Sequence, residues 1–269
     1  MSKVWETGWT EEGRRKVVRS WQKALERVAA HLESIEDTIV FYLLERAQFK
    51  HNRDAYEKGK SEYEGRDDES LLDIRLLKAE TSDAEDGRYT MPEEVPFNKN
   101  IPASKRKVRR SMADMYSGVC LEEGNRVDLS SQIFSKYLAF LVNLCERGDD
   151  DNHGSATERD IPALRALAER IHYGAMYVAE CKFNMDPEGY AELIKKKDRE
   201  GLNAKLTRDE IEKRILARVR VKVMDFQKDT NPDVRRHVQA DVIAEFYRDV
   251  VIPLTKEGEI QYLMQKKIG

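Results

Sequence analysis

The sequence predicts an all-α protein, a single-domain multi-helix bundle that spans residues 1–269. Composition supports this fold class, because the chain has only 14 Gly and 7 Pro among its 269 residues and is 36% charged. No alternation of apolar and polar residues, which would indicate a strand, continues for more than a few positions. Apolar side chains instead recur at the three- and four-residue spacing of a helix early in the chain, at Leu25, Val28, Leu32, Ile35, Ile39 and Leu43.

The expected helices are separated by charged or proline-rich segments. A first long helix over 14–48 precedes a loop-rich region over 51–101, which holds a short helix at 71–80. The helices that carry the candidate site follow over 156–267, after a turn at 148–154. The other expected helices cover 104–124, 130–147, 156–184, 187–197, 207–228 and 240–267, with a capping box at Thr207 and Glu210 and a kink at Pro253.

Charge and cysteine usage narrow the classes of function. The net charge is −3 and the pI is about 6.1, so no global positive field suggests a nucleic-acid partner. The basic run SKRKVRR, residues 104–110, lacks flanking aromatic residues and is interpreted as a solvated helix start. The three cysteines have no CxxC spacing, which predicts reduced, buried thiols. No signal-like or membrane-length apolar segment is present, so we expect a cytoplasmic protein without a membrane partner, a secreted form remaining open if a signal peptide was removed.

The most informative segment is NHGSATERDIPALRALAERIHYGAMYVAECKF, residues 152–183. It places Arg170 and Lys182 on one long helical segment behind an HGS turn. Two cations held rigidly on a helix suit a dianionic small molecule. His172 has no second His or Cys at metal-ligand spacing, so it is interpreted as a packed, hydrogen-bonded histidine. We expect no metal and no cofactor.

Four blocks along the chain resemble the fungal and plant all-helical chorismate mutases. The first is IEDTIVFYLLERAQF, residues 35–49, and the second is the segment with the GS turn, RIHYG and VAECKF. LIKKKDREGL (193–202) with EKRIL (212–216), and then IPLTKEGEIQYL (252–263), complete the order. Ordered blocks over roughly 230 residues are far more specific than a lone short motif.

The resemblance implies the fold of that family, typically a homodimer, and the Claisen rearrangement of chorismate to prephenate in phenylalanine and tyrosine biosynthesis. No covalent intermediate is needed, because the enzyme holds a flexible dianion in its reactive conformer. Arg170 would bind one carboxylate, and Lys182 would contact the ether oxygen and a carboxylate. Glu259 would face the ether oxygen in its protonated form, so burial should raise its pKa. Glu212 would bind the ring hydroxyl, and Thr255 would support the carboxylate end.

Three departures from the family pattern concern this site. The family arginine on the first helix corresponds to Ala29, and the family's usual asparagine before Glu212 corresponds to Arg208, a candidate substitute cation that binds substrate. Arg170 and Lys182 are twelve residues apart instead of eleven, which on a regular helix rotates Lys182 by roughly 120°. A π-bulge at 175–177 would restore the common face, and we predict one there.

The family's effector site, which binds tyrosine or tryptophan, is only partly kept. Asn152, Gly154 and Ser155 match it, whereas the family's arginine pair appears as Leu77 and Lys78 and a threonine appears as Glu158. Carboxylate recognition favours a guanidinium, so weak or absent feedback regulation is expected.

Two alternatives to a mutase with a remodelled pocket remain open. A related substrate is suggested by Ala29 and Arg208, since moving a cation across a pocket changes substrate preference. A non-catalytic role through protein contacts is suggested by the long charged insertions at 51–70 and 82–101.

Overall fold

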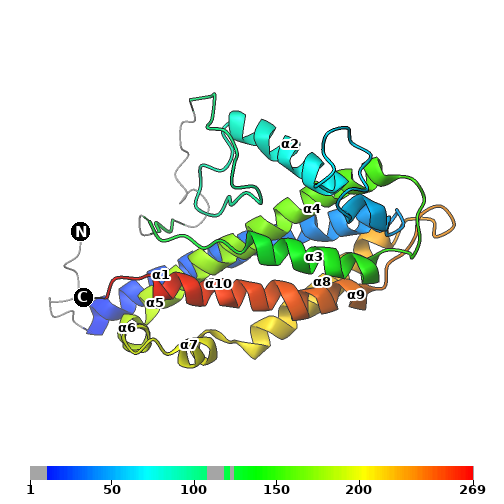
Figure 1. The fold of residues 1–269 in the computed structure, drawn as a ribbon. Helices are drawn as coiled ribbons and strands as arrows, with labels where there is room; N and C mark the ends of the chain where they lie inside the picture. Colours follow the sequence, from blue (N-terminus) through cyan, green and yellow to red (C-terminus); the bar gives the residue numbers. More distant parts are fainter. Residues whose placement is uncertain (1–10, 108–117, 122–123, 269) are drawn as a thin grey trace.

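A computed structural model describes residues 11–107, 118–121 and 124–268. These residues form helices and connecting segments, and none of them is in a strand, as predicted (Figure 1). None of the described helices is long and apolar enough to cross a membrane. The α-helices are α1 (Glu11–Arg46), α2 (Leu71–Glu85), α3 (Ser130–Leu144), α4 (His153–Tyr173), α5 (Ala179–Met185), α6 (Pro187–Lys195), α7 (Arg199–Leu206), α8 (Asp209–Gln227), α9 (Ala240–Phe246) and α10 (Ile252–Met264). A 3₁₀ turn covers Arg53–Tyr56, a first π-helix covers Gly174–Val178, and a second π-helix covers Tyr247–Val251.

The centre of the bundle is the pair α1 and α4, which run along the molecule in opposite directions (Figure 1). The apolar stripe of α1 makes this contact, and Val28, Ile39 and Leu43 on it are fully buried. α10 runs beside them, while α6 and α7 lie at the end where α1 begins and α10 ends. The hydrophobic core is one cluster that extends from Ala24 in α1 to Leu263 in α10. The candidate site residues therefore come from helices that share this core.

The region between residues 195 and 209 differs from the prediction. α7 was not expected, and Asp198 caps it by accepting a hydrogen bond from the backbone N–H of Gly201 at 2.8 Å. The capping box predicted at Thr207 was wrong, since α8 begins at Asp209. The Thr207 hydroxyl instead donates to the Asn203 carbonyl at 2.8 Å and closes α7.

The last helical region also differs from a simple kink at Pro253. Pro253 lies in the first turn of α10, and the irregularity precedes it as the second π-helix, Tyr247–Val251. A proline lacks the N–H that would donate to the carbonyl four residues earlier, and a wider turn accommodates its ring.

Two further expectations, the helix at 104–124 and the burial of all three cysteines, are not met in the described residues. Most of the helix expected at 104–124 lies outside the described residues, and the described positions at 104–107, 118–121 and 124 are not helical. Cys145 and Cys181 are buried free thiols as predicted, but Cys120 is exposed.

Candidate functional site

The first π-helix joins α4 to α5 without a break in the helical path. The bulge predicted at 175–177 is confirmed, since the π-helix covers Gly174–Val178. A π-turn absorbs one more residue than an α-turn, so it offsets the rotation that a twelve-residue separation imposes on a regular helix. The local backbone thereby allows Arg170 and Lys182 to face the same side.

Arg170 lies in the last turn of α4 and is only 4% exposed. Its Nη2 is 3.9 Å from Oε1 of Glu36, too long for a hydrogen bond. Among the described residues, neither Nε nor Nη1 of Arg170 has a hydrogen-bond partner. Burial lowers the pKa of its guanidinium, which also lies within electrostatic reach of Glu259. A buried guanidinium with two nitrogens that lack partners is suited to bind a carboxylate.

Glu36 is the fully buried carboxylate that this cation faces, and it already has other partners. Arg218 donates to it twice, from Nε at 2.8 Å and from Nη2 at 2.9 Å. Lys222 lies on the same face of α8, with its Nζ 3.6 Å from Glu36 and 2.9 Å from the exposed Asp37. Three cations thus lie within 4 Å of one buried carboxylate, but Arg218 also pairs with Glu33 and Lys222 also pairs with Asp37. In the described part of the chain, Arg170 is therefore the cation of this cluster whose donors remain open to an anionic ligand.

Lys182 and Glu259 form the second charged pair of the site. Nζ of Lys182 donates to Oε2 of Glu259 at 2.8 Å and to the carbonyl of Leu206 at 3.1 Å, so α7 helps to orient it. Burial raises the pKa of the Glu259 carboxyl, although the charges of Lys182, Lys256 and Arg170 oppose the shift. The direction agrees with the expectation from the sequence.

Thr255 lies on α10, one turn before Glu259, and packs near Gly174 and Arg170. It is 8% exposed, and its hydroxyl donates to the Val251 carbonyl at 2.8 Å. A Cβ added to Gly174 would lie 2.9 Å from Cγ2 of Thr255 and 3.1 Å from Nη1 of Arg170. The absence of a side chain at Gly174 therefore lets Thr255 and Arg170 approach each other.

Glu212 and Arg208 lie farther out, at the start of α8. Glu212 pairs with Lys256 at 2.9 Å, and both side chains are partly exposed. Arg208 is exposed and precedes the first residue of α8. Burial and the charge of Glu259 raise the pKa of the buried Tyr190, and the charge of Arg208 opposes this rise. Arg208 and Glu259 therefore both interact electrostatically with Tyr190.

Ala29, the position of the missing arginine, is exposed on α1. It lies one helical turn before Leu32, which a Cβ on Gly174 would approach to 3.6 Å. It also precedes Glu33 by four residues, and Glu33 pairs with Arg218 at 2.9 Å. Position 29 thus borders the cluster around Glu36, but a methyl group brings no charge to it.

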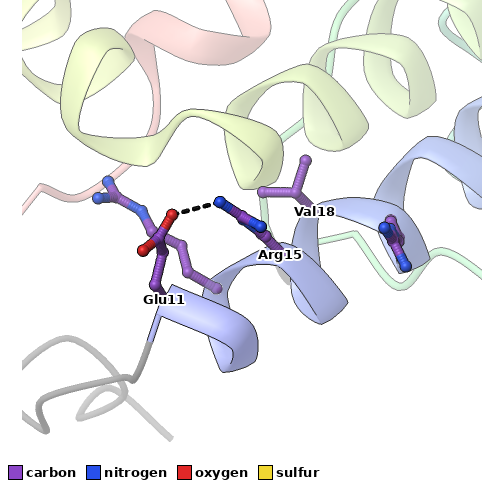
Figure 2. Close-up of a pocket in the computed structure, with 5 residues that line it drawn as sticks. Glu11, Arg15 and Val18 are labelled. Atoms are coloured by element: carbon purple, nitrogen blue, oxygen red, sulfur yellow. Dashed lines mark hydrogen bonds and ion pairs between the residues drawn. The ribbon is translucent and has the colours of Figure 1, made fainter.

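A separate hollow at the start of α1 has no connection to these residues. Figure 2 shows Glu11, Arg15 and Val18 lining it, and Arg15 pairs with Glu11 within the same helix. Arg14, which also lines it, pairs with the exposed Glu188 of α6. Exposed pairs on one helix are weak, and no buried polar group points into this hollow from the lining residues.

The effector-like turn lies at the opposite end of α4 from Arg170. Asn152 and Ser155 are exposed there, and the carbonyl of Gly154 accepts a hydrogen bond from Nη1 of Arg75 at 2.6 Å. A guanidinium thus lies at this turn, although the family's arginine pair is replaced by Leu77 and Lys78. Lys78 points elsewhere, with its Nζ 4.3 Å from the centre of the Tyr63 ring.

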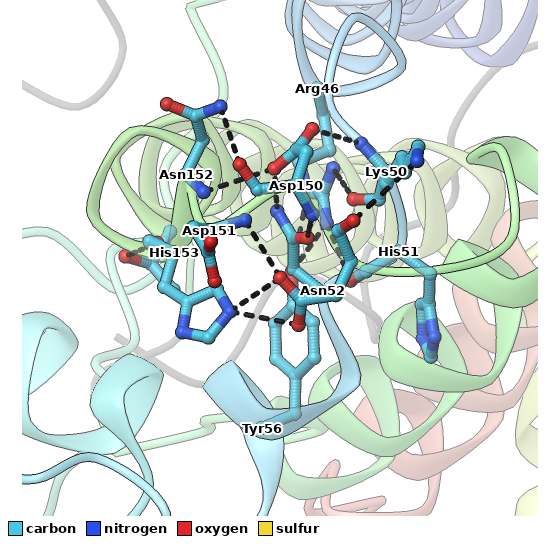
Figure 3. A network of polar contacts seen from close by, with 11 residues as sticks. Arg46, Lys50, His51, Asn52, Tyr56, Asp150, Asp151, Asn152 and His153 are labelled. Carbon is cyan, nitrogen blue, oxygen red and sulfur yellow. Dashed lines mark hydrogen bonds and ion pairs between the residues drawn. The ribbon is translucent and has the colours of Figure 1, made fainter.

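Asp150 holds the same turn to the end of α1. Figure 3 shows it between Lys50, Asn52 and Asn152, and it accepts hydrogen bonds from the three at 2.8–3.0 Å. Asp149, Asp151 and His153 are the one group in the described residues whose ligand atoms could converge on a metal ion. Hydrogen bonds within the turn already join them, so the cluster does not by itself indicate a metal.

Sequence reasoning missed several residues of the charged centre. Glu36 was noted only as part of a motif, and its partners were not anticipated. The four-residue spacing of Arg218 and Lys222 was a usable signal, because it places two cations on one face of α8. Tyr247 is a further missed residue, and it is fully buried within electrostatic reach of Arg170. The residues missed are Glu36, Arg218, Lys222, Tyr247, Lys256 and Tyr190.

Comparison with known proteins gives the family. No protein-family model matches the chain. The chorismate mutase of Schizosaccharomyces pombe is 36% identical over 254 residues, which cover 90% of this chain and 96% of that protein. The structure of a Candida albicans chorismate mutase in complex with L-Trp superposes with a TM-score of 0.78 at 33% identity, covering 88% of this chain and 89% of the other. The chloroplast chorismate mutase from Zea mays gives a TM-score of 0.77 at 32% identity, covering 90% and 94%. With this identity over nearly the full length of both sequences, the chain belongs to the chorismate mutase family.

Proposed function

We propose that this protein catalyses the rearrangement of chorismate to prephenate in a remodelled site. The observation that carries the proposal is the buried Arg170 guanidinium with two free nitrogens, within electrostatic reach of the Lys182–Glu259 pair. Family membership supports it, since members of this family are named for that reaction. The site offers cations and hydrogen-bond donors, which are the groups this chemistry requires.

The reaction breaks one carbon–oxygen bond and forms one carbon–carbon bond within a single molecule. Neither an oxidant nor a net proton transfer is required. The site therefore has to hold the dianion in a compact conformer and stabilise the negative charge that grows on the ether oxygen. Arg170 would hold one carboxylate, Lys182 would contact the ether oxygen and a carboxylate, and Thr255 would support the carboxylate end.

Glu259 would act as a hydrogen-bond donor to the ether oxygen. Its raised pKa supports this role, because only the protonated carboxyl can donate. Lys182 and Glu259 would then separate from their direct contact when substrate binds between them. Glu212, held by Lys256, would bind the ring hydroxyl at the outer side.

Chorismate consumption by the purified protein, with prephenate identified after acid conversion to phenylpyruvate, tests the proposal. Lys182→Ala is expected to lower kcat/KM by about 10²–10³-fold, since it removes a cation aimed at the developing charge. Lys196→Ala is the matched control, because Lys196 lies in an exposed pair with Glu192. Intact chorismate at high concentrations of the wild-type protein would overturn the assignment.

A related substrate is the second candidate, and the exposed Ala29 is the observation that favours it. Without a cation at position 29, the site loses one partner for a carboxylate. Arg208 would supply positive charge from the side of Tyr190 and Glu259. Product analysis by mass spectrometry with chorismate and its 4-amino analogue separates the two candidates, and Arg208 should disfavour the analogue's ammonium group.

We further propose that the chain is a single domain and forms a homodimer with weak effector control. The core that extends from α1 to α10 supports a single domain. Arg75 at the Gly154 turn is already engaged with a carbonyl group, which leaves it less free to bind an effector carboxylate. Light scattering should give twice the 31.3 kDa chain mass, and added tyrosine or tryptophan should change the rate little.

A further inference from the structure

The first π-helix, which takes up one residue more than an α-turn, lies against α10. Ala175 in the π-helix is fully buried. A Cβ added to Gly258 of α10 would lie 2.5 Å from the Cβ of Ala175, far inside the distance at which two carbon atoms pack. The two backbones therefore approach each other only because residue 258 has no side chain.

The same point is enclosed by other side chains. The added Cβ would also lie 3.2 Å from Cδ1 of Leu129 and 3.3 Å from Cγ1 of Val127. Both of these residues are about 1% exposed and belong to the core. A side chain at 258 thus has no open space to enter, and either α10 or the π-helix would have to shift.

This contact lies beside the charged groups of the site. Gly258 immediately precedes Glu259, whose carboxylate accepts the 2.8 Å hydrogen bond from Lys182. Thr255, one turn earlier on the same face of α10, faces Gly174 at the start of the π-helix, where an added Cβ would lie 2.9 Å from Thr255 Cγ2. α10 and the π-helix therefore meet at two glycines that alternate between the helices.

We propose that Gly258 is a positioning residue for the Lys182–Glu259 pair. Its missing side chain accepts Ala175, and this allows the π-helix that keeps Lys182 on the same side as Arg170. Filling position 258 would either move Glu259 away from Lys182 or expel the bulge, and each residue of register lost rotates Lys182 by about 100°. The catalytic consequence rests on the proposed mutase activity, whereas the pairing of Gly258 with the bulge does not.

A cycle of variants tests this pairing. The variants are Gly258→Val, deletion of Ala175, and both changes together, with Gly258→Ala as the milder form if valine prevents folding. Deleting Ala175 brings Lys182 to eleven positions after Arg170, about three turns of a regular α-helix, and valine would then fill the space that Ala175 vacates. Thermal unfolding, kcat and KM are measured for each protein.

Each single change is expected to lower the melting temperature and to reduce kcat/KM by about 100-fold, with the larger effect on kcat. The double variant should recover most of both quantities. A Gly258→Val variant with unchanged kcat, or a double variant whose losses equal the sum of the two single losses, would overturn the proposal. If the wild-type protein shows no turnover, the proposed function fails, and recovery of the melting temperature in the double variant still decides the pairing.

Discussion

Three cations share the buried carboxylate of Glu36, and two of them also pair with Glu33 or Asp37. Arg218 contacts it at 2.8 Å, and Arg170 and Lys222 lie at 3.9 and 3.6 Å. At 3.9 Å, Glu36 offsets the charge of Arg170 without accepting a hydrogen bond from it. Arg170 retains two free nitrogens among the described residues as a result, and this is the physical basis of the predicted dianion site.

Placing a cation at position 29 is the most direct test of the proposed remodelling of the pocket. Ala29→Arg should raise kcat/KM for chorismate by about 10- to 100-fold, because it returns a carboxylate partner at the edge of the Glu36 cluster. Ala30→Arg is the matched control, since Ala30 is also exposed but points about 100° away on α1. Equal rates for the two variants would show that position 29 does not face the substrate.

The titration of Glu259 should appear in the pH dependence of the reaction. Burial raises its folded-state pKa above the usual 4.5, so the protonated donor is present at low pH and is lost as pH rises through the raised value. We therefore expect kcat/KM to fall across that range. Glu259→Gln keeps a donor that does not titrate and should remove the fall.

The control for this measurement is Glu257→Gln. Glu257 is a neighbouring carboxylate on α10 that pairs with the exposed Arg199 at 2.8 Å. Its substitution should leave the pH profile unchanged. The same fall in Glu259→Gln as in the wild type would assign the titration to another group.

At the scale of the elements, His172 connects α4 to the segment that precedes α3. Its Nε2 accepts a hydrogen bond from the backbone N–H of Leu129 at 3.0 Å, which confirms the sequence interpretation of a packed histidine. Burial lowers the pKa of His172 to about 4. The neutral ring is therefore required in the folded state, and protonation removes the acceptor.

Stability should decrease as the pH falls through this window. The unfolded histidine binds a proton near pH 6.5 and the folded one only near 4, so the stabilisation is complete above 6.5 and is lost as the pH falls toward 4. The loss should be on the order of 3 kcal/mol in the free energy of unfolding measured with urea. His172→Gln should reduce this dependence, and His237→Gln, at an exposed histidine, should not.

At the scale of the whole molecule, a buried polar network joins α1, α3 and α4. Asp160 accepts hydrogen bonds from Nε of Arg46 at 2.9 Å and from the hydroxyls of Tyr56 and Tyr137 at 2.7 Å each. Arg46 also donates to three backbone carbonyls after α1, at Phe49, Lys50 and His51. Figure 3 shows Arg46 beside Lys50, His51 and Tyr56. The network fixes the end of α1 to the first half of α4, whereas Arg170 lies in the last turn of α4.

Removing one partner of this network should be strongly destabilising. Asp160→Asn should lower the free energy of unfolding by about 3–5 kcal/mol, because it leaves the Arg46 charge buried without its counter-charge. Glu188→Gln breaks the exposed pair with Arg14 and should change stability by less than about 0.5 kcal/mol. A similar melting temperature for both variants would contradict a structural role for the Arg46–Asp160 pair.

Local patterns in the sequence were enough to predict the helical class and most helix positions, because the apolar period of α1 is readable along one segment. The first π-helix was predicted from the twelve-position step between Arg170 and Lys182 together with the family resemblance, which implies that both face the same side. The same resemblance grouped Arg170, Lys182 and Glu259 in the proposed site. The capping signal at Thr207 was ambiguous, because this residue lies between the end of α7 and the start of α8. As a result α7 was missed, and Thr207 was assigned to α8 although its hydroxyl bonds to α7.

Which charged side chains meet depends on the packing of helices that are far apart in the sequence. Arg218 binds Glu36 across 182 positions of sequence, and Lys182 binds Glu259 across 77. The approach of Gly258 to Ala175 likewise depends on how α10 packs against the π-helix. Periodicity predicts which face of a helix is buried, but the partner on the other side is set by the packing of the whole core, and no local pattern encodes it.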